Sequence, residues 1–189
     1  MSSTFQKHRI LKNRGFNLIE ISVVLGIVGL VVAGTFAAWG SMSTQTKIKK
    51  SMEQATVISN GIRNSYASQS SMEAANTDLT PAVINGSIAP ASWLTNGNIT
   101  NAWGGNVTVA VGATSSQFAI TFSGIPGSLY TECVGFANAA WNAMHNNGMV
   151  SIQGNGNTKN SAAVNVGTLC ATGATATTNL VLTYNLKTN

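Results

Sequence analysis

Charged side chains are scarce in this sequence, at 8% of 189 residues, and they become rarer along the chain. The part from residue 67 onward carries only Glu73, Asp78, Glu132, Lys159 and Lys187. So few and so scattered carboxylates do not favour a metal site or an acid–base pair. The other polar residues there are Asn, Ser, Thr, Gly and Gln, which give a charged partner little electrostatic guidance.

Histidine and cysteine are also rare, which leaves little material for catalysis. The two histidines are His8 and His145, and His145 is expected near the end of a helix, where a cation suits the helix dipole. Cys133 has no base close to it in the sequence, and the Asn-Gly-Asn stretch at 155–157 lacks the acidic ligands of a calcium loop. The glycines form no phosphate-binding motif. We therefore expect no enzymatic activity, no metal and no cofactor.

The excess of positive charge lies at one end of the chain. The formal net charge is +5, but four of the ten cations fall within residues 1–15. These are Lys7, Arg9, Lys12 and Arg14. Without this segment six cations would face five acids, so the side-chain charge would be +1. A nucleic-acid partner is therefore not predicted, whereas a basic flank is typical of the cytoplasmic side of a membrane segment.

Proline is missing from residues 16–39, which are apolar and rich in small side chains. A stretch of this length predicts a helix that crosses a membrane. From Gly15 to Thr46 the only charge is that of Glu20. A carboxylate at bilayer depth costs about 3 kcal/mol, so Glu20 requires a partner. Cleavage after Gly15 would create an amine at Phe16, the obvious counter-ion for Glu20 on a neighbouring chain.

The helix is expected to continue through residues 40–68 with one apolar face. Its members follow one another at steps of four and three residues: Ile48, Met52, Ala55, Ser59, Ile62 and Tyr66. This spacing predicts an amphipathic helix that packs against a globular head. Lys47, Lys49 and Lys50 lie near the junction, where they would either meet phospholipid headgroups or form a solvated face.

Residues 69–189 are predicted to form that head. Apolar residues alternate at 107–111 and at 118–122, which predicts an antiparallel hairpin. Further strands are expected at 149–152, 162–166 and 180–186. The fold class is therefore α+β, with a long N-terminal helix packed on an antiparallel sheet of four or five strands.

Two shorter helices are predicted within the head. Thr80 is expected to cap a helix that ends at Asn85-Gly86. Ser128 is expected to cap a longer helix, with Glu132 in its first turn and apolar residues at helical spacing as far as Met144.

The N-terminal pattern resembles the signal of type IV pilin precursors, which joins a basic leader, a glycine, an aromatic residue, a glutamate and an apolar helix. The resemblance implies that a prepilin peptidase removes residues 1–15 by cutting between Gly15 and Phe16, and that Phe16 is then N-methylated. It also implies that Glu20 pairs with the Phe16 amine of an adjacent subunit. Residues 16–39 would then serve as a filament-core helix after leaving the membrane.

Later parts of the chain resemble the type IVb pilins, which include bundle-forming and conjugative thin pilins. The stretch Asn-Ala-Trp-Gly-Gly at 101–105 looks like their Asn-Pro-aromatic-Gly-Gly stretch, with Ala102 in place of the proline. Cys133 and Cys170 look like the family's disulfide, which bounds the variable D-region, here residues 133–170. An exported head also favours a bridge over two free thiols. Two features differ from that group: a fifteen-residue leader is short for type IVb pilins, and a first-position Phe, here Phe16, is more usual in type IVa pilins.

The resemblance implies a major pilin that rests in the inner membrane with its head in the periplasm and then polymerises into a surface filament. Such a filament would serve attachment, cell–cell contact or conjugation. The implied partners are further copies of the chain, the prepilin peptidase, the inner-membrane assembly machinery, the outer-membrane secretin and inner-membrane lipid. Three alternatives stay open: a minor, tip-located adhesive pilin, a pseudopilin of type II secretion, or an ordinary exported or membrane-anchored binding protein. In the last case the apolar run would be cut near Ala37 or Ala38, or kept as an anchor.

Overall fold

The computed structural model describes residues 17–161 and 165–187, and the chain divides into two units between Met42 and Ser43. A single helix, α1 (Leu18–Ser65), contributes residues to both units. The Oδ1 atom of Asn17 accepts a hydrogen bond from the backbone N–H of Ile19 at 3.4 Å. This contact satisfies one of the free donors in the first helical turn. The bounds of α1 confirm the helix predicted over residues 16–68 for nearly its whole length.

The N-terminal unit carries the apolar part of α1. The stretch Leu18–Phe36 has a mean hydropathy of 2.3, and by length and composition it can cross a membrane. None of it is buried within the chain.

The head unit, which begins at Ser43, is built on one antiparallel sheet in the strand order β1-β2-β3-β4-β7-β5-β6. The strands are β1 (Leu94–Thr95), β2 (Asn98–Thr100), β3 (Asn106–Val111), β4 (Gln117–Pro126), β5 (Met149–Gly154), β6 (Asn157–Lys159) and β7 (Thr177–Asn185). The predicted hairpin is confirmed, because β3 and β4 pair with Val109 opposite Ile120. The last strand, β7, lies between β4 and β5.

The sheet has more strands than the four or five that were predicted. The additional strands β1, β2 and β6 are two or three residues long, too short for an alternating pattern to reveal them. Asn-Gly turns connect β1 to β2 and β5 to β6, and all four turn residues, from Asn96 to Gly97 and from Asn155 to Gly156, have positive φ. Such two-residue turns match the twist of an antiparallel pair.

Of the strand predicted at 162–166, the two residues that the structure describes, Asn165 and Val166, do not belong to a strand. Residues 162–164 lie outside the described residues. Val166 begins a 3₁₀ helix, η4 (Val166–Leu169), because the Asn165 side chain accepts a hydrogen bond from the N–H of Gly167 at 2.9 Å. An asparagine at this position favours a turn over an extended strand.

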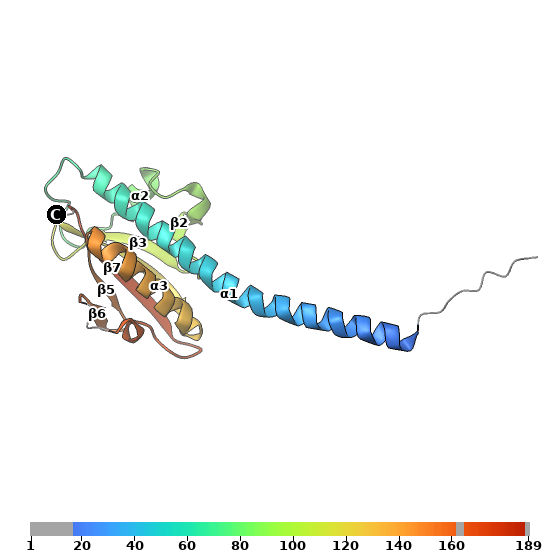
Figure 1. Ribbon diagram of the computed structural model, residues 1–189. Helices are drawn as coiled ribbons and strands as arrows, with labels where there is room; N and C mark the ends of the chain where they lie inside the picture. Colours follow the sequence, from blue (N-terminus) through green and yellow to red (C-terminus); the bar gives the residue numbers. More distant parts are fainter. Residues whose placement is uncertain (1–16, 162–164, 188–189) are drawn as a thin grey trace, which may run out of the picture. The chain divides into compact units, whose positions relative to one another are not determined.

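One face of the sheet is covered by two helices that lie side by side (Figure 1). One is the head part of α1, and the other is α3 (Tyr130–Met144). Tyr184 of β7 contacts both, because its ring lies 5.7 Å from the guanidinium carbon of Arg63 and its hydroxyl donates to the Met144 sulfur at 2.8 Å. Burial raises the pKa of Tyr184 far above its ordinary value, although Arg63 acts in the opposite direction.

The face predicted for residues 40–68 is the one that packs on the sheet. Of its six members, four are buried and Met52 and Tyr66 are partly buried. The buried surface of α1 is wider than predicted, since Ser51, Gln54 and Ile58 are also fully covered. Gln54 donates to the carbonyl oxygen of Thr100 at 2.9 Å, which explains part of its burial.

Both predicted caps are wrong. The helix α2 (Thr80–Asn85) is preceded by Leu79, and the Thr80 hydroxyl instead bonds the backbone of Val109 in β3. The helix α3 starts after a short 3₁₀ turn, η2 (Gly127–Leu129), and has no side-chain cap. In α2, a tertiary contact therefore takes the hydroxyl that the sequence pattern assigned to a cap. Two further 3₁₀ helices, η1 (Ala91–Trp93) and η3 (His145–Asn147), complete the head.

Candidate functional site

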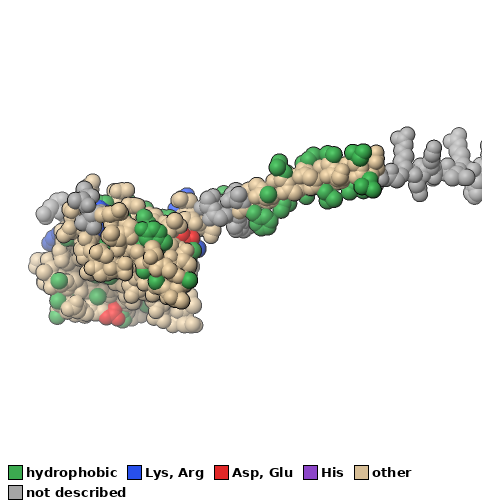
Figure 2. Space-filling model, turned by 90° about the horizontal axis from the view of Figure 1, so that it is seen from below, with side chains coloured by type: hydrophobic (Ala, Val, Ile, Leu, Met, Phe, Trp, Pro, Cys, Tyr) green, Lys and Arg blue, Asp and Glu red, His purple; other side chains and the backbone are tan. Residues whose placement is uncertain are grey.

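Large apolar side chains surround the N-terminal part of α1 on all sides. Figure 2 shows groups of hydrophobic side chains along both edges of this helix, whereas the side of the head in that view has few charged side chains. Their exposed fractions range from 45% at Val32 to 83% at Leu18. At about 25 cal/mol per Å² of apolar area, such a surface is strongly driven out of water and toward lipid or other helices.

The hydroxyls in this segment do not need water. The Ser22 hydroxyl donates to the carbonyl oxygen of Ile19 and the Thr35 hydroxyl to that of Val32, both at 2.8 Å. Bonds within the helix therefore satisfy both groups in an apolar environment. Glu20 is exposed and lines a shallow depression with three apolar neighbours.

The residues predicted for processing lie at and before the start of this helix. Gly15 and Phe16 are outside the described residues, so the predicted pairing of Glu20 with the Phe16 amine stays a prediction. Glu20 itself lies in the first turn of α1, where the helix dipole favours a negative charge.

Glycines in the apolar segment leave room beside the helix. A Cβ atom added at Gly26, Gly29 or Gly34 would meet nothing within 4 Å in the described structure. No contact within the described chain therefore requires glycine at these positions. Small residues on a helix surface allow another helix to approach closely.

Within the head unit, a buried carboxylate binds two residues near the start of the head part of α1. Glu132, in the first turn of α3, is only 5% exposed. It accepts hydrogen bonds from Lys47 Nζ at 3.1 and 3.3 Å, from Thr44 Oγ1 at 3.2 Å and from Trp103 Nε1 at 2.7 Å. We call these four residues the Glu132 cluster.

The loop that supplies Trp103 is held by one asparagine. Asn101 is 3% exposed, and its Oδ1 accepts bonds from the N–H groups of Trp103 and Gly105 at 2.9 and 3.0 Å. Its Nδ2 donates to the carbonyl oxygen of Ser123 in β4 at 2.8 Å. Gly104 has φ +87°, which favours glycine. The 101–105 stretch thus forms a turn that directs the indole N–H toward Glu132.

The two cysteines form a disulfide, as the resemblance implied. Cys133 and Cys170 are bonded, with their Cα atoms 6.0 Å apart. The bond joins the first turn of α3 to the segment after η4, and it encloses β5 and β6. Both cysteines are buried, and because their sulfur atoms are bonded to each other, neither residue has a free thiol that could act as a nucleophile.

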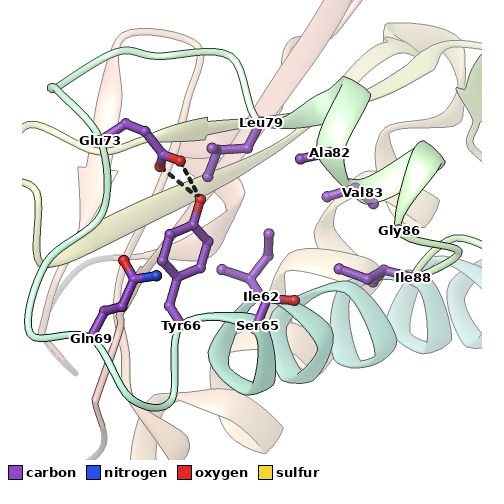
Figure 3. Close-up of a pocket in the computed structure, with 10 residues that line it drawn as sticks. All are labelled: Ile62, Ser65, Tyr66, Gln69, Glu73, Leu79, Ala82, Val83, Gly86 and Ile88. Carbon is purple, nitrogen blue, oxygen red and sulfur yellow. Dashed lines mark hydrogen bonds between the residues drawn. The ribbon is translucent and has the colours of Figure 1, made fainter.

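A pocket of about 280 Å³ lies between the C-terminal end of α1, the following loop and α2 (Figure 3). Ile62, Leu79 and Val83 form part of its apolar lining. Tyr66 points toward Glu73, and its hydroxyl lies 2.7 Å from each carboxylate oxygen. The pKa of Tyr66 is raised to about 12, first by burial and second by this hydrogen bond. The pocket combines an apolar lining with one anionic group and brings together no nucleophile and base.

The other candidates for chemistry are engaged in packing. The His145 ring stacks on Trp141 with centroids 4.1 Å apart. Lys159 is 4% exposed, and its Nζ lies over the ring of the same Trp141, 4.7 Å from the centroid. Within residues 17–161 and 165–187, no group of three His, Cys, Asp or Glu residues could hold a metal ion.

The sequence pattern did not reveal the Glu132 cluster. Lys47 was assigned to headgroups or to a solvated face, and Glu132 only to the first turn of a helix. The two residues are 85 positions apart, so no local period connects them. The scarcity of acids could have directed attention to Glu132, because it is the only acid between Asp78 and the end of the printed sequence.

Comparisons with known proteins agree with this arrangement. A family model described as bundlin matches residues 40–187. Among solved structures, the chain is similar to TcpA, a type IV pilin from Vibrio cholerae El Tor biotype, with 14% identity and a TM-score of 0.53. The match covers 74% of this chain and 99% of that one, and at this identity it shows a shared fold. The search of curated proteins found no match to the sequence.

Proposed function

The chain belongs to the bundlin family of type IV pilins, and from this premise we propose that it is the major subunit of a type IVb pilus. Proteins of this family are structural: they polymerise into pilus filaments. The observation that carries the proposal is the exposed apolar surface of Leu18–Phe36, interrupted by the single carboxylate of Glu20. This surface suits two environments, the hydrocarbon of a bilayer and the helical core of a filament.

The mechanism that we propose uses the same helix in both environments. Before assembly the apolar segment lies in the inner membrane, with the head on the periplasmic side. A prepilin peptidase then cuts between Gly15 and Phe16, which removes the basic leader and creates an amine at Phe16. Assembly exchanges contacts with lipid for contacts with neighbouring helices.

In this mechanism Glu20 selects the register between subunits. Its carboxylate pairs with the Phe16 amine of an adjacent subunit, so that two charges are neutralised in an apolar filament core. A buried pair of this kind contributes little net stability when it is compared with an apolar contact, but loss of one partner leaves an isolated charge. Misregistered subunits are therefore disfavoured more strongly than correctly paired ones are favoured.

The other partners follow from the same proposal. They are the inner-membrane assembly machinery, the outer-membrane secretin and bilayer lipid, in addition to further copies of the chain. The disulfide-bounded region 133–170 would form part of the exposed filament surface. Its surface is almost free of charge, which suits neutral, hydrogen-bonding contacts more than electrostatic ones.

Mass spectrometry of protein sheared from the cell surface tests this proposal. A peptide that begins at N-methylated Phe16, from the most abundant filament protein, is the expected result. A chain that begins beyond Ala38, or an uncut chain, would remove the processing and assembly proposals. Low abundance in filaments built mainly of another protein would indicate a minor pilin.

A variant separates the role of Glu20 from that of the leader. We expect Glu20→Ala to be cut normally and to yield few or no surface filaments, because the Phe16 amine loses its counter-ion. Glu53→Ala is the matched control, since Glu53 is an exposed acid in the head part of the same helix. Normal filaments from Glu20→Ala would contradict the proposed pairing.

A further inference from the structure

The Glu132 cluster lies at the N-terminal end of the head part of α1. The head unit begins at Ser43, and Thr44 and Lys47 belong to the first turn of α1 within it. The next inward side chain is Ile48, whose Cδ1 lies against Gly135 of α3: a Cβ added to that glycine would come within 2.7 Å of it. Among the described residues, the N-terminal end of the head part of α1 therefore contacts α3 through the Glu132 carboxylate and through Ile48.

The arrangement of donors restrains the helix in more than one direction. Thr44 and Lys47 are three residues apart, so they project from the same side of the helix. Both bind the carboxylate of one buried residue, which also accepts a hydrogen bond from the indole N–H of Trp103. Rotating or sliding α1 would break at least one of these bonds and leave a buried anion under-satisfied. Apolar contacts alone permit such movements at lower cost, because they are not directional.

The Lys47 side chain is 30% exposed, whereas that of Glu132 is 6% exposed. The lysine can therefore exchange its partner for water, but the carboxylate cannot. A buried charge that depends on donors from two other segments links those segments to its own. Glu132 thus holds together the start of α3, the 101–105 turn and the first turn of α1 in the head.

We propose that Glu132 is a positioning residue for filament assembly: it sets the rotation and the axial position of the head part of α1 on α3 and the 101–105 turn. The proposal rests on the proposed function, because only a subunit that polymerises through α1 needs this geometry. It predicts that loss of the carboxylate loosens the first turns of α1 within the head while the rest of the head remains folded.

Glu132→Gln tests the proposal with little change in side-chain shape. We would measure hydrogen–deuterium exchange on the full mature chain in detergent micelles, together with filaments sheared from cells. In the variant we expect exchange in peptides covering residues 43–52 to be at least about tenfold faster, and exchange over residues 55–62 to stay within about twofold of the parent. Surface filaments should fall sharply, with normal removal of the leader.

Two further variants keep the test decisive. Lys47→Arg retains a cation, so hydrogen–deuterium exchange and filament formation should stay as in the parent. Trp103→Phe removes only the indole donor, so exchange over residues 43–52 should become faster, but less so than in Glu132→Gln. Glu53→Gln, on the exposed side of the same helix, is the control for loss of an acid. If Glu132→Gln does not fold, the Trp103→Phe result decides the question.

The outcomes distinguish this proposal from the proposed function. If Glu132→Gln shows the same hydrogen–deuterium exchange as the parent and forms normal filaments, the carboxylate only fills space. A uniform rise in exchange over the whole head would show a role in overall stability and not in positioning. If the parent chain itself forms no filaments, the proposed function fails, and the local exchange result still decides whether Glu132 holds α1.

Discussion

Loss of the Cys133–Cys170 bond should destabilise the head by about 4 kcal/mol. The bond joins residues separated by 37 positions, so it removes many extended conformations from the unfolded chain. For a loop of this length, the chain-entropy expression gives about 13 cal/mol/K, which is about 4 kcal/mol at room temperature. A loss of this size is a large part of the stability of an ordinary domain.

Urea unfolding of the full chain in detergent micelles measures this effect. Tryptophan fluorescence reports on the head, where Trp93 and Trp141 are buried. With a slope of about 2 kcal/mol per molar urea, a loss of about 4 kcal/mol lowers the midpoint by about 2 M. Reduction of the parent protein keeps both sulfur atoms in place and therefore isolates the effect of the covalent link.

The alanine pair Cys133→Ala with Cys170→Ala serves as a second measurement. Because both side chains are buried, removing their sulfur atoms should add a packing cost to the loss of the link. We therefore expect the alanine pair to unfold at a lower urea concentration than the reduced parent. A shift below about 0.5 M on reduction, at an unchanged slope, would refute the entropic reasoning.

Two other predictions concern the turn and the pocket. Gly105→Ala places a Cβ atom against the carbonyl oxygen of Ser123, so we expect a loss of at least about 2 kcal/mol, measured by thermal unfolding. Because the pKa of Tyr66 is raised from 10.0 to about 12, its stabilising contribution is complete below pH 10 and is lost as the pH rises through about 12. Glu73→Gln should lower the pKa of Tyr66, which phenolate absorbance during an alkaline titration would detect; an unchanged titration would contradict the role of the carboxylate.

The elements that could be predicted from the sequence are those with a regular spacing of apolar residues. The row that includes Ala55 and Ile62 was predicted because burial on a helix repeats every three or four residues. The pairing of β3 with β4 followed in the same way from alternation. Within the described chain, the strands that were missed have too few residues for any period.

Contacts between distant residues could not be predicted in this way. The bond between Lys47 and Glu132 depends on how α3 lies beside α1, and the role of Trp103 depends on the turn built around Asn101. The disulfide was predicted from the resemblance to a family and from an exported head, since the spacing of two cysteines in a sequence does not determine the distance between them. Processing after Gly15 is a property of an enzyme and its substrate, and it stays a prediction.

The central position of β7 has a consequence for the timing of folding. This strand, Thr177–Asn185, is hydrogen-bonded to β4 on one side and to β5 on the other. Because a ribosome makes the chain from its N-terminus, β4 and β5 both emerge before the strand that joins them. Until residue 185 is available, the nascent head consists of separate pieces with unpaired strand edges, which are prone to associate with other chains. The head can therefore become a single sheet only after synthesis has passed this strand, and premature termination within β7 should produce an aggregating chain instead of a shortened pilin.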